Sequence, residues 1–329
     1  MTSETKRPTP EDIEESLLGG QRRYTRRQLD ELAGVSEDYA RRIWRALGFA
    51  DVPDDMVVFT EGDLAALRRV ADIFRSGLVD EELALRLARA MGQQMARLAE
   101  WQMDAVVDSL AAPDEPPAAE ATRRAVEMAE RLAPEFEALL LHVWRRQIAA
   151  TGARVLAADD TEVSPTRTRR AVGFVDLVSF TELSRKLGED ELVDLVEDFE
   201  NTATDAVTEF GGRVVKTLGD EVLFVTDAPG DGAEVALRLA EKFRLNEESP
   251  DVRVGMAYGT VLLRVGDVFG TTVNLASRLT SFARPGTVLV DARLAEELEG
   301  HTAYRLVSIR QRSARGIGVV TPYVVRRRR

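Results

Sequence analysis

The hydrophobic periodicity of the chain changes near Arg170, and this change constrains the fold more than any other feature. From about Pro10 to Met103, apolar residues recur every three or four positions, as on the buried face of an amphipathic helix. After Arg170 the pattern becomes short apolar runs separated by turn residues, which is typical of strands. A chain of 329 residues is long enough for two ordinary domains. The sequence therefore predicts a helical domain followed by a domain that contains a sheet.

The region between the two patterns contains a break and a long helix. Residues 111–117 are rich in proline and interrupt the helical pattern. A long amphipathic helix is predicted from about 118 to 150, with Pro134 as a possible point of division and Gly152 as a stop. We expect a helical domain at 1–117, a linker helix and connector at 118–169, and a second domain at 170–329.

The second domain is expected to be of the α+β class, with a largely antiparallel sheet. Strand-like runs occur at 171–178, 212–217, 221–226, 252–257, 259–264, 286–290 and 319–325. Helical runs lie between them at 188–210, 231–246, 271–283 and 291–298.

The composition excludes several classes of protein. The net charge of −12 argues against a chain that coats nucleic acid or a membrane surface. The chain has no cysteine, which excludes disulfides and thiolate metal sites. No stretch approaches the ~20 apolar residues that span a bilayer, and the first residues lack the apolar core of a signal peptide. We expect a cytosolic protein without a membrane span.

Two aspartates stand at the ends of strand-like runs. Asp176 lies near the end of the first run, and Asp220 lies at a turn between two others. A lone buried carboxylate costs several kcal/mol, so two such sites suggest a shared hard cation, Mg²⁺ or Mn²⁺ on a nucleotide phosphate. The alternative is that Lys216, just before the same turn, simply neutralises Asp220.

The segment from Arg264 to Arg278 joins a glycine-bounded loop to a predicted helix. Asn274 and Arg278 are four residues apart and share a helix face. An amide and a guanidinium presented together suggest contacts with a ribose and a phosphate. Thr271 or Thr272 is predicted to cap the helix.

Three motifs together resemble the catalytic domain of class III adenylate cyclases. A single motif of this length is a weak signal, whereas three in register are specific. The resemblance runs from about Thr168 to the C-terminus and implies a ferredoxin-like βαββαβ core. The short segment before Asp267 is similar to that of the class IIIc subgroup. The motifs are Phe174-Val-Asp-Leu-Val-Ser-Phe-Thr181, Lys216-Thr-Leu-Gly-Asp-Glu221 and Asp267-Val-Phe-Gly-Thr-Thr-Val-Asn-Leu-Ala-Ser-Arg278.

The resemblance implies a role for each matched residue. Asp176 and Asp220 would bind two divalent cations, Lys216 and Asp267 would read the adenine edge, and Asn274 and Arg278 would orient the ribose and stabilise the transition state. Arg315 and Arg264 would contact phosphates. For Asp267, a loop or capping carboxylate is the alternative.

The activity implied by the resemblance is the conversion of ATP to cyclic AMP and pyrophosphate by a homodimer. Each site would lie between two catalytic domains, with Asp176, Asp220 and Arg264 from one subunit and Lys216, Asp267, Asn274, Arg278 and Arg315 from the other. The alternatives are a guanylate or relaxed-purine cyclase and, in another class, a transcription regulator with a cyclase-like domain.

The segment from Tyr24 to Phe49 has a helix-turn-helix pattern, and its continuation from Phe59 resembles MerR-type regulators. Its acidic residues dilute the positive charge, so we favour a helical scaffold over a DNA-binding module. Such helical regions, joined to a cyclase of this subgroup, act as autoinhibitory or sensing domains. The arginines of its basic face are Arg22, Arg23, Arg26, Arg27, Arg41, Arg42 and Arg45.

Two features remain outside these motifs. His142, in the predicted linker helix, is a candidate proton switch or, alternatively, a packed core residue. The terminal run Arg326–Arg329 is interpreted as a solvated end, with phosphate or lipid binding as the alternative.

Overall fold

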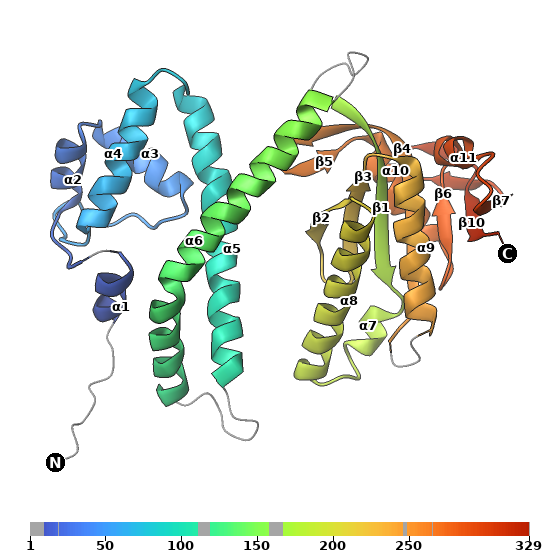
Figure 1. Cartoon of the computed structure of the whole chain (residues 1–329), viewed down its shortest axis with the longest axis horizontal. Helices are drawn as coiled ribbons and strands as arrows, with labels where there is room; N and C mark the ends of the chain where they lie inside the picture. The colour runs from blue at the N-terminus through green and yellow to red at the C-terminus, as the bar shows by residue number, and fades with distance from the viewer. Residues whose placement is uncertain are drawn as a thin grey trace. The chain divides into compact units, whose positions relative to one another are not determined.

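The computed structural model of the chain has two units with separate cores, Met1–Gly152 and Ala153–Arg329 (Figure 1). The predicted break at 111–117 and residues 158–166 of the predicted connector lie outside the part of the chain that the structure describes. The described residues are 10–18, 20–110, 119–157, 167–245, 249–264 and 266–328.

The N-terminal unit is built from helices, which confirms the helical domain predicted there. Its core joins α2 to α4 through Leu29, Leu64 and Leu67, which are almost fully buried. Ile43 of α3 packs with Ala88 of α5 in a second cluster. The helices are α1 (Pro10–Leu17), α2 (Arg26–Ala33), α3 (Glu37–Ala46), α4 (Glu61–Arg75), α5 (Glu81–Leu110) and α6 (Ala119–Ala157).

The predicted helix-turn-helix is present and has well-defined ends. Thr25 and Gln28 form a reciprocal capping box at the start of α2. Gly34 ends α2 with a φ of 68°, a left-handed conformation that favours glycine. Ser36 then accepts a hydrogen bond from the Tyr39 N–H and starts α3. These local signals explain why the turn is found where the sequence predicts it.

Helix α6 is longer than predicted. It contains Pro134 and continues past Gly152 to Ala157, so the prediction that Gly152 stops the helix was wrong. A glycine inside a helix costs only about 1 kcal/mol relative to alanine, and the helix-forming residues Ala149, Ala150 and Ala153 surround this one.

The second unit contains an eight-stranded mixed sheet that confirms the predicted α+β class. The strand order is β2-β3-β1-β4-β6-β10-β7, with β5 paired to β4. Among the strand pairs of the described residues, β4 and β6 alone run parallel. The strands are β1 (Arg167–Leu177), β2 (Arg213–Thr217), β3 (Glu221–Thr226), β4 (Val252–Arg264), β5 (Asp267–Phe269), β6 (Val288–Val290), β7 (Tyr304–Ser308) and β10 (Tyr323–Arg327); β8 (Arg312–Ala314) and β9 (Gly318–Val320) form a separate hairpin.

Helices cover both faces of this sheet. Helices α8 and α9 lie along the face turned toward the viewer in Figure 1, and their core includes Phe199 and Leu239. Helix α10 packs on the other face, where a Cβ atom on Gly255 of β4 would lie 2.0 Å from the Thr280 nitrogen. Only glycine permits this close approach. The helices are α7 (Phe180–Leu183), α8 (Glu189–Glu209), α9 (Pro229–Leu245), α10 (Thr271–Phe282) and α11 (Ala292–Leu298).

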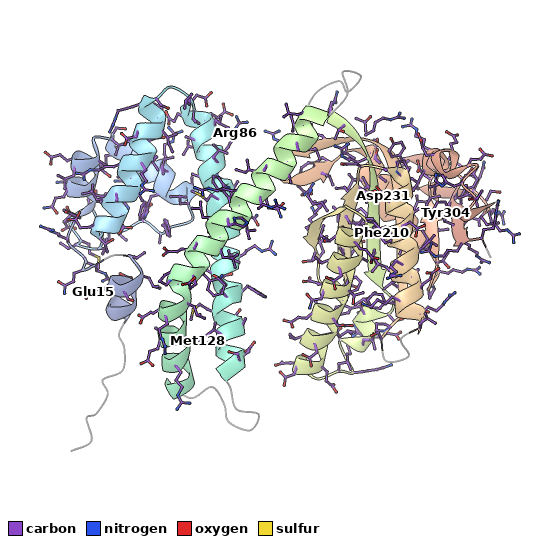
Figure 2. All side chains as sticks on the ribbon, viewed as in Figure 1. Glu15, Arg86, Met128, Phe210, Asp231 and Tyr304 are labelled. Atoms are coloured by element: carbon purple, nitrogen blue, oxygen red, sulfur yellow. The ribbon has the colours of Figure 1, made fainter. Side chains whose placement is uncertain are left out.

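Several predicted strand limits were wrong. The runs at 252–257 and 259–264 are one strand, β4, because nothing at Tyr258 interrupts the extended backbone. The run at 319–325 is split between β9 and β10 around Pro322, which has no backbone donor. The sequence also failed to predict β7, which carries Tyr304 (labelled in Figure 2). The Tyr304 hydroxyl donates a hydrogen bond to Glu234 of α9 at 2.7 Å.

Candidate active site

Asp176 is held by an arginine on the next strand. It is the second-to-last residue of β1 and lies opposite Glu221 of β3 on one side and Arg253 of β4 on the other. Arg253 donates from Nε to Oδ1 at 2.8 Å and from Nη2 to Oδ2 at 3.2 Å. A two-point contact of this kind fixes the carboxylate plane. Asp176 is therefore oriented before any ligand binds.

Two more carboxylates lie close to Asp176. Burial and the nearby charge of Asp176 raise the pKa of Asp220, which lies in the turn between β2 and β3. Burial, followed by the charges of Asp176 and Asp220, raises the pKa of Glu221 to about 7. The predicted aspartates are thus brought together, in a cluster whose negative charge Arg253 only partly offsets.

Lys216 and Asp267 form a direct ion pair although they are 51 residues apart. Lys216 Nζ lies 2.7 Å from Asp267 Oδ2, and the Val268 N–H donates to Oδ1 at 2.7 Å. Burial opposes ionisation of Asp267, but the bonds from Lys216 and Val268 outweigh it and lower its pKa. The alternative in which Lys216 neutralises Asp220 was wrong, since the ammonium group contacts Asp267 instead.

The acidic cluster and the Lys216–Asp267 pair lie on one face of the sheet. Asp176 is two residues after Phe174 in β1 and therefore points to the same face of the sheet, where Phe174 packs with Ala276 of α10 and Val268 of β5. The pairing of β2 with β3 shifts between Val214 and Lys216. A bulge of this kind breaks the alternation of side chains. Lys216 therefore lies on the same face of the sheet as its partner Leu223, the face that α10 covers.

Helix α10 presents the predicted amide and guanidinium on this same face. Asn274 and Arg278 are both exposed, one turn apart, as predicted. The predicted threonine cap was wrong, because the helix begins after Gly270 without a side-chain cap, and Thr272 donates its hydroxyl hydrogen bond to the Thr260 carbonyl at 3.0 Å.

The remaining predicted residues are less closely associated. Arg264 ends β4, is exposed and lies opposite Asp267 in the strand pairing. Arg315 is exposed in the turn between β8 and β9. His142 is exposed on α6, so the alternative of a packed core residue was wrong for the single chain. Within the described part of the chain, none of these three side chains forms an ion pair with the carboxylates of the site.

Sequence reasoning missed Glu221 and Arg253. Both gave a usable signal: Glu221 directly follows Asp220, and Arg253 is the one charged residue in the apolar run 252–257. In a strand, the residue directly opposite a buried carboxylate is its nearest partner. That pairing becomes visible only once the strand register is known.

The carboxylates suit an ion that is shared with a ligand. Among the described residues, no three Asp, Glu or His side chains are gathered tightly enough to hold a metal alone. Mg²⁺ characteristically takes one or two carboxylates and completes its shell with water and substrate phosphates. Two aspartates in an electronegative cluster fit that pattern.

The comparisons with known proteins agree with this geometry. Residues 164–327 match the family described as "Adenylate and Guanylate cyclase catalytic domain", and residues 12–151 match the "Adenylate cyclase regulatory domain". The chain therefore combines a nucleotidyl cyclase catalytic domain with a regulatory domain.

Relatives define the family more closely. The chain is 47% identical to an adenylate cyclase of Streptomyces coelicolor over 96% of this chain and 89% of that protein. It is 51% identical to an adenylate cyclase of Streptomyces griseus over 88% of this chain and 72% of that protein. The crystal structure of the catalytic core of a rhodopsin-guanylyl cyclase with converted specificity matches with a TM-score of 0.47 and 24% identity, over 49% of this chain and 97% of that one. The chain belongs to the class III adenylate cyclase family, as its motifs predict.

No helix in the described ranges is long and apolar enough to cross a membrane.

Proposed function

We propose that this chain converts ATP to cyclic AMP and pyrophosphate at sites shared by two subunits. The observation that carries the proposal is the placement of the Lys216–Asp267 pair and the Asp176–Asp220 cluster on one face of one sheet. One group is suited to a purine and the other to cations on a triphosphate. The names of the relatives support ATP as the substrate.

The choice of adenine follows from hydrogen-bonding capacity. Adenine presents an acceptor at N1 and a donor at its amino group, whereas guanine presents the reverse. Lys216 donates to N1, and Asp267 accepts from the amino group. The lowered pKa of Asp267 keeps it ionised and able only to accept. A donor at Lys216 and an acceptor at Asp267 do not match the guanine edge, so this pair of side chains disfavours a guanylate cyclase.

Asp176 and Asp220 would hold two divalent cations, Mg²⁺ or Mn²⁺. The chemistry that these ions supply when bound is a lower pKa for the ribose 3′-hydroxyl and neutralisation of the triphosphate. Arg253 keeps Asp176 oriented toward that role. Because Asp220 and Glu221 repel further negative charge, a cation is the natural partner of the cluster.

The protein groups then position the reacting atoms. Asn274 orients the ribose so that its 3′-oxygen attacks the α-phosphate in line and pyrophosphate leaves. Arg278 stabilises the charge that develops on the α-phosphate in the transition state. Arg315 and Arg264 contact the leaving phosphates. The 3′-hydroxyl proton passes to Asp176 or to solvent.

In a homodimer, the metal-binding aspartates of one subunit and the adenine-binding pair of the other subunit would act on the same ATP molecule. In this family the adenine and metal groups act at opposite walls of a site between two catalytic domains. Asp176, Asp220 and Arg264 of one subunit would face the Lys216, Asp267, Asn274, Arg278 and Arg315 side chains of the other. Two-fold symmetry then produces two equivalent sites.

The N-terminal unit is proposed to regulate the catalytic unit. Its match to a regulatory domain supports this role, and α6 provides a continuous element for transmission. His142, exposed on α6, is the candidate proton switch. An unchanged pH–activity profile in His142→Gln would remove it from this role.

DNA binding receives no support from the N-terminal unit. Six of the seven arginines of the predicted basic face form ion pairs within the unit, all but Arg27. Paired arginines attract phosphates weakly because their charge is already compensated.

The direct test uses the purified full-length protein with Mn²⁺ and either ATP or GTP. We expect cyclic AMP from ATP and little product from GTP. Asp176→Asn and Asp220→Asn should each abolish activity and weaken Mn²⁺ binding measured by electron paramagnetic resonance, with Asp231→Asn as the matched control. Full activity in either site variant would contradict the proposal. Higher activity in residues 160–329 alone would indicate autoinhibition.

A further inference from the structure

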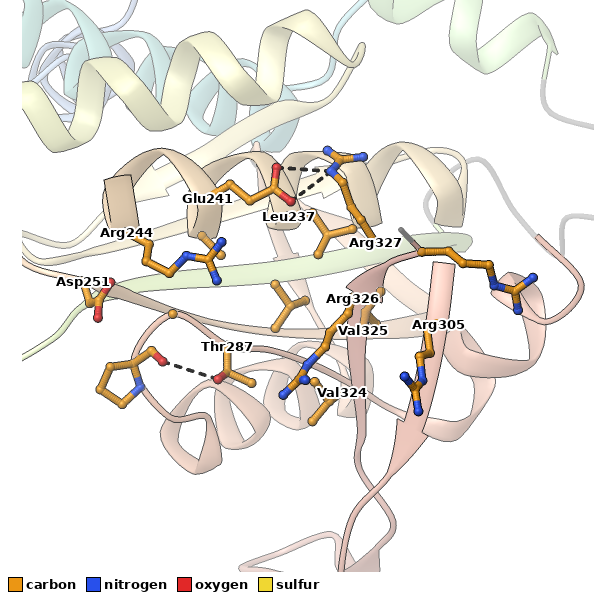
Figure 3. Close-up of a pocket in the computed structure, with 15 residues that line it drawn as sticks. Leu237, Glu241, Arg244, Asp251, Thr287, Arg305, Val324, Val325, Arg326 and Arg327 are labelled. Carbon is orange, nitrogen blue, oxygen red and sulfur yellow. Dashed lines mark hydrogen bonds and ion pairs between the residues drawn. The ribbon is translucent and has the colours of Figure 1, made fainter. Parts of the chain in front are cut away.

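A second group of like charges lies in the catalytic unit, away from the predicted cyclase residues. A hollow of about 960 Å³ is bordered by the C-terminal half of α9, residues 285–288 and the paired strands β7 and β10 (Figure 3). We call it the arginine hollow. No residue assigned above to ATP or metal binding lines it. Its arginines are Arg244, Arg305, Arg326, Arg327 and Arg328.

Most of this positive charge lacks a carboxylate partner. Arg327 is the exception, since its Nε contacts the two oxygens of Glu241 at 3.0 and 3.1 Å and its Nη1 contacts Glu234 at 2.8 Å. Glu241 is thereby occupied, and Asp251 is the only other acid in the lining. In the described part of the chain, the other four arginines form no ion pair.

The strand pairing adds an unfavourable contact that a bound anion would relieve. Arg305 of β7 lies directly opposite Arg326 of β10. Like charges at directly opposed positions destabilise a sheet. In Figure 3, Arg305 and Arg326 extend from one side of the neighbouring strands, while Arg244 extends from α9 on the other side. Guanidinium groups from separate elements thus border the hollow from both sides of the sheet.

The size and the walls of the hollow restrict the ligand. Pockets of about 300–1,000 Å³ accommodate small molecules the size of a cofactor. Val288, Val324 and Leu237 supply apolar surface beside the arginines. Arginine binds phosphate oxygens with two parallel hydrogen bonds, and several guanidinium groups match several phosphate charges. We propose that the arginine hollow binds a soluble small molecule that carries a di- or triphosphate group.

This proposal changes the interpretation of the terminal arginines. The sequence favours a solvated end at Arg326–Arg329, but Arg326 and Arg327 belong to β10 and lie beside Arg305 and Arg244. The site is independent of the cyclase assignment, because it shares no residue with it.

The test measures binding of inorganic tripolyphosphate to the full-length protein by isothermal titration calorimetry in EDTA. Without divalent cations, binding at the Asp176–Asp220 cluster is suppressed. We expect saturable binding of one tripolyphosphate per chain, weakened at least tenfold in Arg305→Ser/Arg326→Ser. Arg244→Ser, on a separate element, should weaken it several-fold. The matched control, Arg310→Ser/Arg312→Ser, removes the same charge outside the hollow and should change affinity less than twofold.

Three outcomes would overturn the proposal. One is the absence of saturable binding by the wild-type protein. The second is an equal loss in the hollow variant and the control variant, which would indicate a general effect of net charge. The third is binding to phosphatidylglycerol vesicles without binding of tripolyphosphate, which would assign the arginines to a lipid surface. Thermal unfolding checks that every variant is folded, which the exposure of the substituted arginines leads us to expect.

Discussion

The two units differ in how their charged side chains are arranged: the helix-turn-helix pairs opposite charges, whereas the catalytic site gathers like charges. In the N-terminal unit, arginines are paired within the fold, as in the 2.8 Å contact of Arg41 with Glu37. In the catalytic unit, the carboxylates of Asp176, Asp220 and Glu221 are gathered despite their repulsion. Paired charges serve the fold, whereas clustered like charges raise its free energy until an opposite ion binds. The contrast supports our proposals that the catalytic unit carries the ligand site and that the helix-turn-helix serves as a scaffold.

The largest effect among single residues outside the metal cluster is expected at Arg278. Its exposed guanidinium has no side-chain partner in the described chain, so its charge is available to the transition state. Arg278→Ala should lower kcat about 10²- to 10³-fold and change KM little. Steady-state kinetics with Mn²⁺ and ATP measure this, with Arg310→Ala as control. A raised KM at unchanged kcat would assign Arg278 to ground-state binding instead.

A smaller loss is expected when the purine pair is altered. Asp267→Asn keeps the shape of the side chain but removes the charge that Lys216 contacts at 2.7 Å. A charge-assisted hydrogen bond is worth roughly 1.5–3 kcal/mol, so kcat/KM for ATP should fall about 10- to 100-fold. The rate with GTP should change less. Equal losses with both nucleotides would mean that Asp267 does not read the base.

The sequence alone allows these site residues to be predicted, because the spacing within each motif identifies them. Asp176, Asp220, Asn274 and Arg278 are fixed by local strand, turn and helix patterns. The contact of Lys216 with Asp267 depends on the β2 bulge and on β5, a three-residue strand too short to predict. Tertiary pairing decides such elements, and single-sequence patterns do not encode it.

The helices and strands can also be divided into those that local sequence signals predict and those that depend on tertiary contacts. The turn at Gly34 and the strand from Glu221 to Thr226 agree with their local signals. The end of α6 does not agree with its local signal, because the helix continues past Gly152, which is only a weak helix stop. The edge strand β7 is held by Tyr304 and by β10, which are distant in sequence. Long-range contacts thus explain why sequence analysis missed β7, whereas the end of α6 was missed because its local signal is weak.

A moderate effect on stability is expected at Asp30, a buried acid of the N-terminal unit whose Oδ2 has no hydrogen-bond partner within the described residues. Burial raises its pKa to about 6, and nearby Arg26 only partly opposes this. The folded state therefore binds the proton more tightly than the unfolded state, so the contribution of Asp30 to stability is fully present below about pH 4 and is lost as pH rises through about 6. Asp30→Asn should remove this loss and gain on the order of 1–2 kcal/mol at pH 7.5.

Thermal unfolding of the full-length protein at pH 5 and pH 7.5 measures this difference. Asp38→Asn, at an exposed position of the next helix, is the control and should change little. A variant that is less stable than the wild type at pH 7.5 would show that the ionised carboxylate of Asp30 is required for the fold.

The smallest effect is expected at the paired arginines of the helix-turn-helix. Arg42 contacts Glu81 and Arg45 contacts Asp51, so their charges are compensated. Arg42→Ala/Arg45→Ala should change the affinity for duplex DNA less than threefold, because little phosphate binding exists to be lost. Fluorescence anisotropy at several salt concentrations tests this. Tight, salt-sensitive and sequence-specific binding that the variant abolishes would reverse the comparison between the units.

The most direct test of the central claim mixes two inactive proteins. Asp220→Ala lacks a metal ligand, and Arg278→Ala lacks the transition-state contact, which are proposed to come from different subunits at each site. A mixed dimer then contains one intact site and one doubly altered site. Random reassociation should restore about a quarter of the wild-type cyclic AMP production. If the mixture stays as inactive as its components while the chains demonstrably exchange, the site does not lie between subunits.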